Sequence, residues 1–149
     1  MNTAVPRTNQ DPDPLSKILQ DSGVRPDSAV RVTGKDGLAP LIWLCRHGFE
    51  NVAYVRQGQG APRDPGDVLL ILHNTAPDEL ERLVNDRPPV RQGGLIIVRT
   101  PAPPTGARND PVHHILERAG YAVERCIPRR THEVHVARRR ARTDDRKAA

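Results

Sequence analysis

Short apolar runs, separated by polar, glycine-rich and proline-rich segments, recur along this chain of 149 residues. Runs rich in Val, Ile and Leu predict buried strands, and apolar residues three or four positions apart predict amphipathic helices. The predicted strands cover residues 28–33, 51–56, 67–72, 94–99, 121–127 and 132–138. The predicted helices cover residues 14–22, 38–47, 77–85 and 111–119. Strands and helices alternate, which is typical of an α/β domain.

The order of these elements predicts how the sheet is built. The unbroken apolar run of residues 68–72 indicates a central strand that is covered on both faces. Residues 28–56 read as strand, turn, helix and strand, a βαβ unit whose two strands are parallel. Four residues separate the last two strands, too few for a parallel crossover, so these strands should form an antiparallel hairpin. We predict a mostly parallel sheet of about six strands, flanked by helices.

Composition and length indicate one domain with short tails. Residues 1–12 are polar and predict a disordered lead-in, residues 13–138 form the α/β domain, and residues 139–149 form a basic, disordered tail. No apolar run approaches the roughly 20 residues of a membrane-spanning helix. Residues 1–14 lack the apolar core of a secretory signal. We therefore expect a cytoplasmic protein that does not associate with membranes.

The formal net charge of +5 is unevenly distributed. Residues 138–149 carry six basic and two acidic side chains, so the rest of the chain is nearly neutral. Arginine outnumbers lysine 20 to 3, a bias that a GC-rich genome explains without any ligand. The tail nevertheless offers candidate contacts to nucleic-acid phosphates, with a solubilising end as the alternative. The candidate nucleic-acid residues are Arg138, Arg139, Arg140 and Arg142.

Several segments match one known family in their order. Residues 30–37 stand where this family has its glycine-rich first motif, residues 49–56 resemble its second strand, and residues 67–73 resemble its fourth. Residues 90–98 resemble its Gly-Gly element before a strand, and residues 119–138 resemble its final hairpin. Over about residues 13–138 the chain thus resembles the class I S-adenosylmethionine-dependent methyltransferases. The resemblance implies a Rossmann-like sheet of the methyltransferase type, with S-adenosylmethionine as cofactor.

The positions that the family uses to bind its cofactor carry different residues here. The acidic position of the first motif is Arg31, and the acidic position that ends the second strand is Arg56. The three glycine positions of the motif fall on Thr33, Lys35 and Gly37. A guanidinium donates hydrogen bonds but accepts none, and it repels the sulfonium and ammonium groups of the cofactor. We therefore expect a degenerate member of the family that is non-catalytic or atypical.

Ligands of open α/β sheets bind outside the carboxyl ends of the strands, where the strand order reverses. That rim should comprise residues 33–37, 56–60, 73–75 and 100–104. Basic side chains that converge there would favour a phosphate, a nucleotide or a carboxylate: Arg31, Lys35, Arg56 and Arg63. The alternative is that they are solvated or paired with Asp36, Asp64 and Asp67. The candidate cofactor-site residues are Arg31, Thr33, Gly34, Lys35, Gly37, Arg56, Asp67, His73 and Asn74.

Other catalytic signals are few. His73 follows the most apolar strand and is the candidate general base at the rim, with a satisfied or exposed histidine as the alternative. Cys45 and Cys126 lie in an apolar helix and an alternating strand, so we expect both in the core.

The remaining histidine pairs do not predict a metal site. His113 and His114 are neighbours on a helix, so their side chains diverge by about 100°. His132 and His135 lie three apart on a strand and should face opposite sides of the sheet. We therefore expect no metal.

Three functional hypotheses follow from these residues. The first is a methyltransferase-like domain that binds a small anionic ligand or a protein partner at the former cofactor cleft. The second is an active S-adenosylmethionine-dependent methyltransferase with a divergent motif, with Asp67, His73 and Asn74 lining its site. The third is a regulator that binds nucleic acid through its basic tail.

Overall fold

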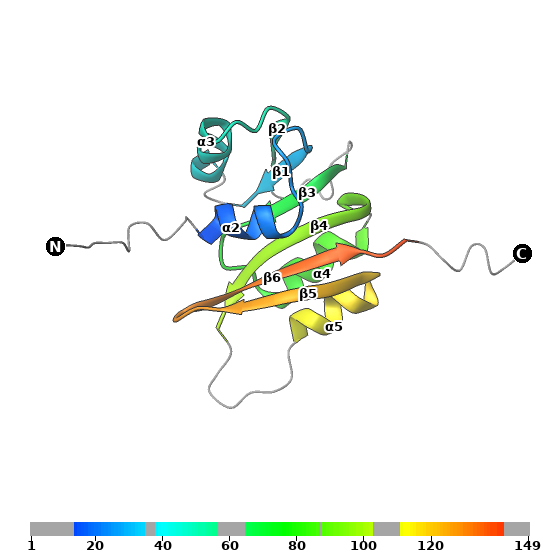
Figure 1. The fold of residues 1–149 in the computed structure, drawn as a ribbon. Helices are drawn as coiled ribbons and strands as arrows, with labels where there is room; N and C mark the ends of the chain where they lie inside the picture. The colour runs from blue at the N-terminus through cyan, green and yellow to red at the C-terminus, as the bar shows by residue number, and fades with distance from the viewer. Residues whose placement is uncertain (1–13, 35–37, 57–64, 87, 103–110, 142–149) are drawn as a thin grey trace, which may run out of the picture.

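The computed structural model describes residues 14–34, 38–56, 65–86, 88–102 and 111–141 (Figure 1). Within these ranges the helices are α2 (Pro14–Asp21), α3 (Leu38–Arg46), α4 (Pro77–Asp86) and α5 (Pro111–Arg118). The strands are β1 (Val30–Thr33), β2 (Val52–Val55), β3 (Gly66–Ile71), β4 (Val90–Pro101), β5 (Tyr121–Pro128) and β6 (His132–Arg139). The helices and strands predicted from the apolar pattern are therefore confirmed. The tails at residues 1–12 and 142–149 and most of the loop at 57–66 lie outside the described ranges.

The six strands form one sheet in the order β2-β1-β3-β4-β6-β5. The first four of these are parallel to one another. β6 is antiparallel to both β4 and β5. The predicted mostly parallel sheet with a terminal antiparallel hairpin is confirmed. β3 lies inside the sheet between two parallel neighbours, as its unbroken apolar run indicates.

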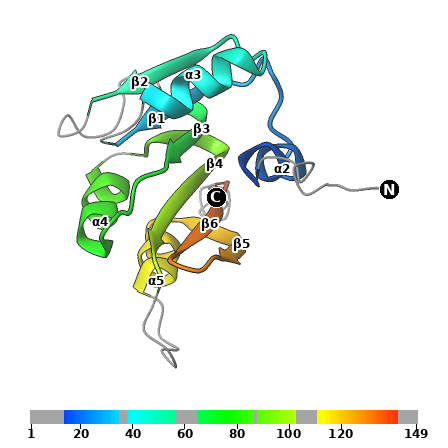
Figure 2. The same ribbon diagram turned by 90° about the vertical axis from the view of Figure 1, so that its left-hand side faces the viewer.

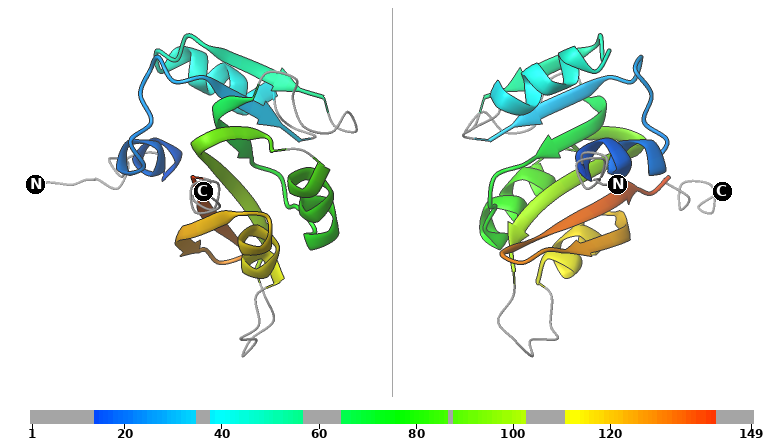
Figure 3. Two further views of the ribbon diagram at one scale, coloured as in Figure 1. Left: turned by 90° about the vertical axis from the view of Figure 1, so that its right-hand side faces the viewer. Right: turned by 60° about the vertical axis from the view of Figure 1, so that its left-hand side comes forward.

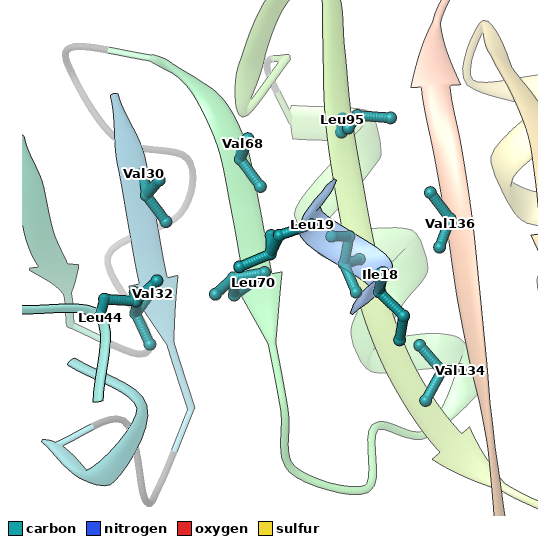
Figure 4. Close-up of a cluster of buried hydrophobic side chains, with 11 residues drawn as sticks. Ile18, Leu19, Val30, Val32, Leu44, Val68, Leu70, Leu95, Val134 and Val136 are labelled. Atoms are coloured by element: carbon teal, nitrogen blue, oxygen red, sulfur yellow. The ribbon is translucent and has the colours of Figure 1, made fainter. Parts of the chain in front are cut away.

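Helices α2 and α3 cover one face of the sheet. Leu19 of α2 lies near Leu70 of β3, and Leu44 of α3 lies near Val32 of β1 (Figure 4). The aliphatic cluster on this face extends across the sheet as far as Val136 of β6. Burial of these side chains is the main force that holds the two helices in place.

Helices α4 and α5 cover the other face (Figures 2 and 3). Leu80 of α4 and Leu116 of α5 are fully buried against alternate residues of the same strands. For example, Ile96 and Val98 of β4 face these helices, whereas Leu95 and Ile97 face α2 and α3. The alternation of side chains in a strand produces this three-layer arrangement.

Strand β4 is longer than the apolar pattern predicts. It begins at Val90, inside a segment that reads as a proline and glycine linker, and continues to Pro101. The pairing of β3 with β4 shifts register near its start, where a Cβ at Gly94 would lie 2.9 Å from the carbonyl oxygen of Asp67. The glycines that signal a loop therefore permit two strands to approach closely.

The expectation that both cysteines lie in the core is wrong. Cys45 and Cys126 are exposed. The apolar sequence of α3 covers more than one side of the helix, and Leu44 is its one fully buried side chain, while Leu38 and Ile42 remain exposed. Cys126 lies on β5, the edge strand of the sheet, where a side chain has a neighbouring strand on one side.

Within the described part of the chain, no helix is both long enough and apolar enough to cross a membrane.

Candidate functional site

The carboxyl ends of the parallel strands lie at one edge of the sheet. From β1 the chain passes through α3 to β2 on one side, and from β3 it passes through α4 to β4 on the other. The strand order therefore reverses between β1 and β3, which is where open α/β sheets bind ligands. We call residues 33–34, 54–56, 73–75 and 99 the switch-point edge.

The side chain of His73 fills the space beside Gly34. A Cβ added at position 34 would collide with Nδ1 of His73 and would lie 3.0 Å from its Cε1. Gly34 also has a φ of 120°, which L side chains rarely adopt. An imidazole therefore lies against the backbone at Gly34, within residues 30–37, where the resembling family has its glycine-rich motif.

Glu79, in the first turn of α4, holds this imidazole in place. Its Oε2 lies 3.2 Å from Nε2 of His73, whose side chain is 13% exposed. Nδ1 of His73 is buried and has no hydrogen-bond partner among the described residues. A general base needs a ring nitrogen within reach of its substrate. In this arrangement one nitrogen faces Glu79 and the other faces Gly34.

Two hydrogen bonds connect the end of β1 to β2. The hydroxyl of Tyr54 donates to the carbonyl oxygen of Gly34 at 2.7 Å, and the hydroxyl of Thr33 donates to the carbonyl oxygen of Val55 at 2.8 Å. The backbone of Gly34 is thus contacted by two side chains, because Tyr54 hydrogen-bonds to its carbonyl oxygen and His73 packs beside its Cα. Arg56 follows directly after β2 and is exposed.

The turn after β3 is fixed to β4. The backbone N–H of Thr75 donates to the carbonyl oxygen of Arg99 at 3.0 Å, and its hydroxyl donates to the carbonyl oxygen of His73 at 2.9 Å. Nε of Arg99 donates to Oδ1 of Asn74 at 3.1 Å. The switch-point edge therefore carries amide, hydroxyl and guanidinium groups, and its backbone is held by hydrogen bonds between the turn after β3 and β4.

Arg31 lies at the opposite, amino end of the strands. Its Nη1 lies 3.2 Å from the carbonyl oxygen of Val30 and 3.3 Å from Oδ1 of Asn51, which precedes β2. Arg31 is 8% exposed, and these oxygens offset part of the cost of burying its charge. Of the two alternatives for Arg31, convergence on the switch-point edge or pairing elsewhere, the structure shows pairing at the amino end, with Val30 and Asn51.

Asp67 also lies at the amino end. Its Oδ2 accepts a hydrogen bond from the backbone N–H of Ala29 at 2.8 Å, and its Oδ1 lies 3.1 Å from Nη1 of Arg91. Asp67 therefore connects the starts of β1 and β3, and it does not lie at the switch-point edge with the other candidate cofactor-site residues. Of the candidate site residues, the structure brings together Thr33, Gly34, Arg56, His73 and Asn74. Lys35, Gly37 and Arg63 lie outside the described residues.

The first arginines of the basic segment take part in the fold. Nε of Arg138 donates to Oε2 of Glu124 at 2.8 Å, Nη1 donates to the carbonyl oxygen of Gly93 at 2.8 Å, and Nη2 donates to that of Ser22 at 3.2 Å. Nη1 of Arg139 donates to the carbonyl oxygen of Val90 at 2.9 Å.

Two other candidate nucleic-acid residues differ from this pair. Arg140 is exposed and hydrogen-bonds through its backbone N–H, and Arg142 lies outside the described residues.

A second group of reactive side chains lies on the hairpin side of the sheet. His113, Cys126 and His135 each offer a ligand atom, and these atoms lie within 4.8 Å of one another. Spacing between histidines in the sequence does not reveal this group, because its three members come from three different elements. The register of the predicted hairpin, combined with the helix before it, is the signal that could have found it.

Several solved structures with a similar fold are methyltransferases. Magnesium protoporphyrin IX methyltransferase from Synechocystis, solved with bound S-adenosylhomocysteine, has a TM-score of 0.63 at 13% identity, covering 93% of this chain and 90% of its own. An S-adenosylmethionine-dependent methyltransferase from Mesorhizobium loti has a TM-score of 0.57 at 14% identity, covering 87% of this chain and 99% of its own. One from Aquifex aeolicus has a TM-score of 0.55 at 14% identity, covering 88% and 95%.

The chain therefore has the Rossmann-like fold of the class I methyltransferases, and the resemblance seen in the sequence is confirmed at the level of the fold. No protein-family model and no curated protein sequence matches it.

Proposed function

We propose that this chain is a methyltransferase-like domain that binds a small anionic ligand at the switch-point edge and does not carry out methyl transfer. The observation that carries the proposal is the contact between His73 and Gly34. A nucleotide-type ligand of a Rossmann-like sheet approaches the backbone closely at its glycines. Here the imidazole of His73 packs against Gly34, between two of the motif's glycine positions at Thr33 and Lys35, and Glu79 holds it there.

The residues of the edge do not fit S-adenosylmethionine. Arg56 stands where the resembling family has the carboxylate that accepts hydrogen bonds from the ribose, and a guanidinium cannot accept them. The cofactor also carries a sulfonium and an ammonium group, which Arg56 and Arg99 repel. These residues therefore do not support methyl transfer from S-adenosylmethionine at this site.

An anionic ligand suits the same groups. Arg56 follows β2 directly and is exposed. Arg99 lies on β4, and its Nε donates a hydrogen bond to Oδ1 of Asn74. Guanidinium groups bind phosphate and carboxylate oxygens through paired N–H donors. Helix α3 begins at Leu38, and its first N–H groups add a favourable dipole for an anion.

Calorimetry with inorganic pyrophosphate as the probe tests the proposal. The full chain should bind it with a Kd below about 1 mM, and Arg56→Glu should weaken binding at least about tenfold, since one charge-assisted hydrogen bond contributes roughly 1.5–3 kcal/mol. Arg46→Glu is the matched control, because Arg46 is exposed at the last residue of α3, away from this edge. Equal binding by Arg56→Glu and wild type would place the anion elsewhere.

An active methyltransferase is the second candidate. The fold shared with structures such as the Synechocystis enzyme, which was solved with bound S-adenosylhomocysteine, favours it. Asn74 and His73 would then lie beside the reacting groups. Transfer of a labelled methyl group from S-adenosylmethionine to any component of a cell extract by the purified chain would support this candidate over the first.

Nucleic-acid binding through the tail is the third candidate. The basic residues beyond Arg140 would supply it, because Arg138 and Arg139 hydrogen-bond within the domain. Removing residues 142–149 should abolish duplex binding at low salt if this candidate is correct. Unchanged binding would exclude the tail as its determinant.

A further inference from the structure

Three metal-ligating side chains meet between α5 and the terminal hairpin. His113 comes from α5, Cys126 from β5 and His135 from β6. Their ligand atoms lie within 4.8 Å of one another. A tetrahedral Zn²⁺ with bonds of about 2.0–2.3 Å holds its ligand atoms about 3.3–3.8 Å apart, so shifts of about 1 Å would bring these atoms to a metal.

The sheet itself places two of the three ligands. Cys126 is directly opposite His135 in the antiparallel pairing of β5 with β6, so their side chains lie on the same face. Ala137, two residues after His135, packs in the cluster beneath α4 and α5, which identifies that face as the one covered by α5. His113 approaches from above it, with its ring edge-on to that of His135 and the ring centroids 5.3 Å apart.

Two neighbouring side chains, those of Thr100 and Glu133, fix one ring nitrogen of His135. His135 is fully buried, and its Nε2 lies 3.0 Å from the hydroxyl oxygen of Thr100 and 3.6 Å from Oε1 of Glu133. Thr100 and Glu133 are paired residues of β4 and β6. A metal-bound histidine commonly has its second nitrogen fixed by a hydroxyl, carbonyl or carboxylate in this way. Nδ1 is then the atom of His135 that faces the metal.

We propose that His113, Cys126 and His135 form a Zn²⁺ site. Two imidazoles and one thiolate are a ligand set that Zn²⁺ prefers, and the hard cations Mg²⁺ and Ca²⁺ prefer oxygen. Three protein ligands leave the fourth position for water, and the exposure of Cys126 gives solvent access to it. The ion links α5 to the hairpin. The site involves none of the residues of the switch-point edge, so it stands independently of the proposed function.

Metal analysis and calorimetry of the full chain test the site. The chain, freed of metal by a chelator and then dialysed, should bind one Zn²⁺ with a Kd of about 1 µM or lower, and Mg²⁺ at the same concentration should not bind. Zn²⁺ should also raise the midpoint of thermal unfolding, because it binds the folded chain in preference to the unfolded one. Absence of Zn²⁺ binding at a few hundred micromolar would overturn the proposal.

For each of the two ligands that we substitute, Cys126 and His113, the chain has a residue of the same type that serves as a matched control. Cys126→Ser and His113→Ala should each weaken Zn²⁺ binding by at least about 100-fold, beyond the 10- to 100-fold typical of losing an outer hydrogen bond. Cys45→Ser changes the other exposed cysteine, and His114→Ala changes the exposed neighbour of His113 on α5, so both should bind like wild type. Binding that survives both Cys126→Ser and His113→Ala would place the metal elsewhere.

A variant outside the ligand set tests the geometry. Glu133→Gln keeps the size of the side chain near Nε2 of His135 and removes its charge, and we expect Zn²⁺ affinity to fall by up to about tenfold. Circular dichroism identifies any variant that fails to fold. Cys126 and His113 lie on different elements, β5 and α5. If only one of the two variants folds, its Zn²⁺ affinity alone tests whether these residues bind the metal.

Discussion

The imidazole of His73, which follows β3, packs against the backbone of Gly34, which follows β1, and leaves no room for a Cβ at position 34. This contact spans the point where the strand order of the sheet reverses. A sheet with the fold of the class I methyltransferases therefore carries an imidazole against Gly34, which lies between Thr33 and Lys35, two of the positions where the resembling family has glycine. The contact predicts a measurable energetic coupling between the two positions.

Gly34→Ala should destabilise the fold by about 2–4 kcal/mol, because the φ of 120° is strained for alanine and the new Cβ meets His73. His73→Ala removes the second cause, so in that background the cost of Gly34→Ala should fall by at least about 1 kcal/mol. Urea denaturation of the two single variants and the double variant measures this coupling.

Gly23→Ala is the control for the strained backbone. Gly23 also has a positive φ, of 82°, but a Cβ there meets nothing within 4 Å. It should cost about 1–2 kcal/mol, with or without His73→Ala. If Gly34→Ala also destabilised the fold equally with and without His73→Ala, the contact between His73 and position 34 would make no contribution to that destabilisation.

The arrangement of strands was largely predictable from the sequence, but the direction of long side chains was not. The four-residue link before His132 sufficed to predict the antiparallel hairpin. Arg31 was placed on a strand correctly, but its side chain reaches back to the amino end, where it meets Asn51. Asp67 lies at that end because it is the second residue of β3, and there it accepts a hydrogen bond from Ala29. A strand pattern specifies the face of a side chain, and tertiary partners decide the end to which it turns.

Tyr121 predicts an alkaline loss of stability. Burial raises the pKa of its hydroxyl to about 12, from an ordinary value of 10.0, while the charge of Arg139 acts more weakly in the opposite direction. The unfolded chain thus loses this proton at a lower pH than the folded chain. The contribution of Tyr121 to stability is full below pH 10 and declines by about 1.4 kcal/mol for each pH unit between 10 and 12.

Tyr121→Phe should remove this part of the pH dependence. The hydroxyl has no hydrogen-bond partner among the described residues, so the variant should be at least as stable as wild type at pH 8. Chemical denaturation at pH 8 and pH 11 compares the two chains, and the wild type should lose about 1.4 kcal/mol more than the variant. Equal losses would contradict the raised pKa.

Arg138→Ala should destabilise the domain by about 1–3 kcal/mol, because its guanidinium donates to the carbonyl oxygens of Gly93 and Ser22 and to the carboxylate of Glu124. Arg140→Ala is the matched control, since its side chain is exposed, and it should change stability by less than about 0.5 kcal/mol. Similar unfolding midpoints for both variants would contradict a stabilising role for the hydrogen bonds of Arg138.

The group at His113, Cys126 and His135 could not be predicted from spacing in the sequence. Neighbouring histidines on a helix or a strand diverge, so pairs of histidines close in the sequence do not indicate a metal site. The group exists because the β5–β6 register sets Cys126 opposite His135 and because α5 packs on the same face. Such a site depends on tertiary structure, and a local motif does not encode it.

The claim that the switch-point edge has lost the cofactor site is tested most directly by calorimetric titration of the full chain with S-adenosylhomocysteine. This product carries no sulfonium, so its binding reports on the glycine and ribose contacts without the repulsion of that charge. We predict no saturable binding up to about 1 mM, equivalent to a binding free energy weaker than about −4 kcal/mol. A Kd in the micromolar range would contradict the account, because His73 and Arg56 would then not prevent binding of a methyltransferase ligand.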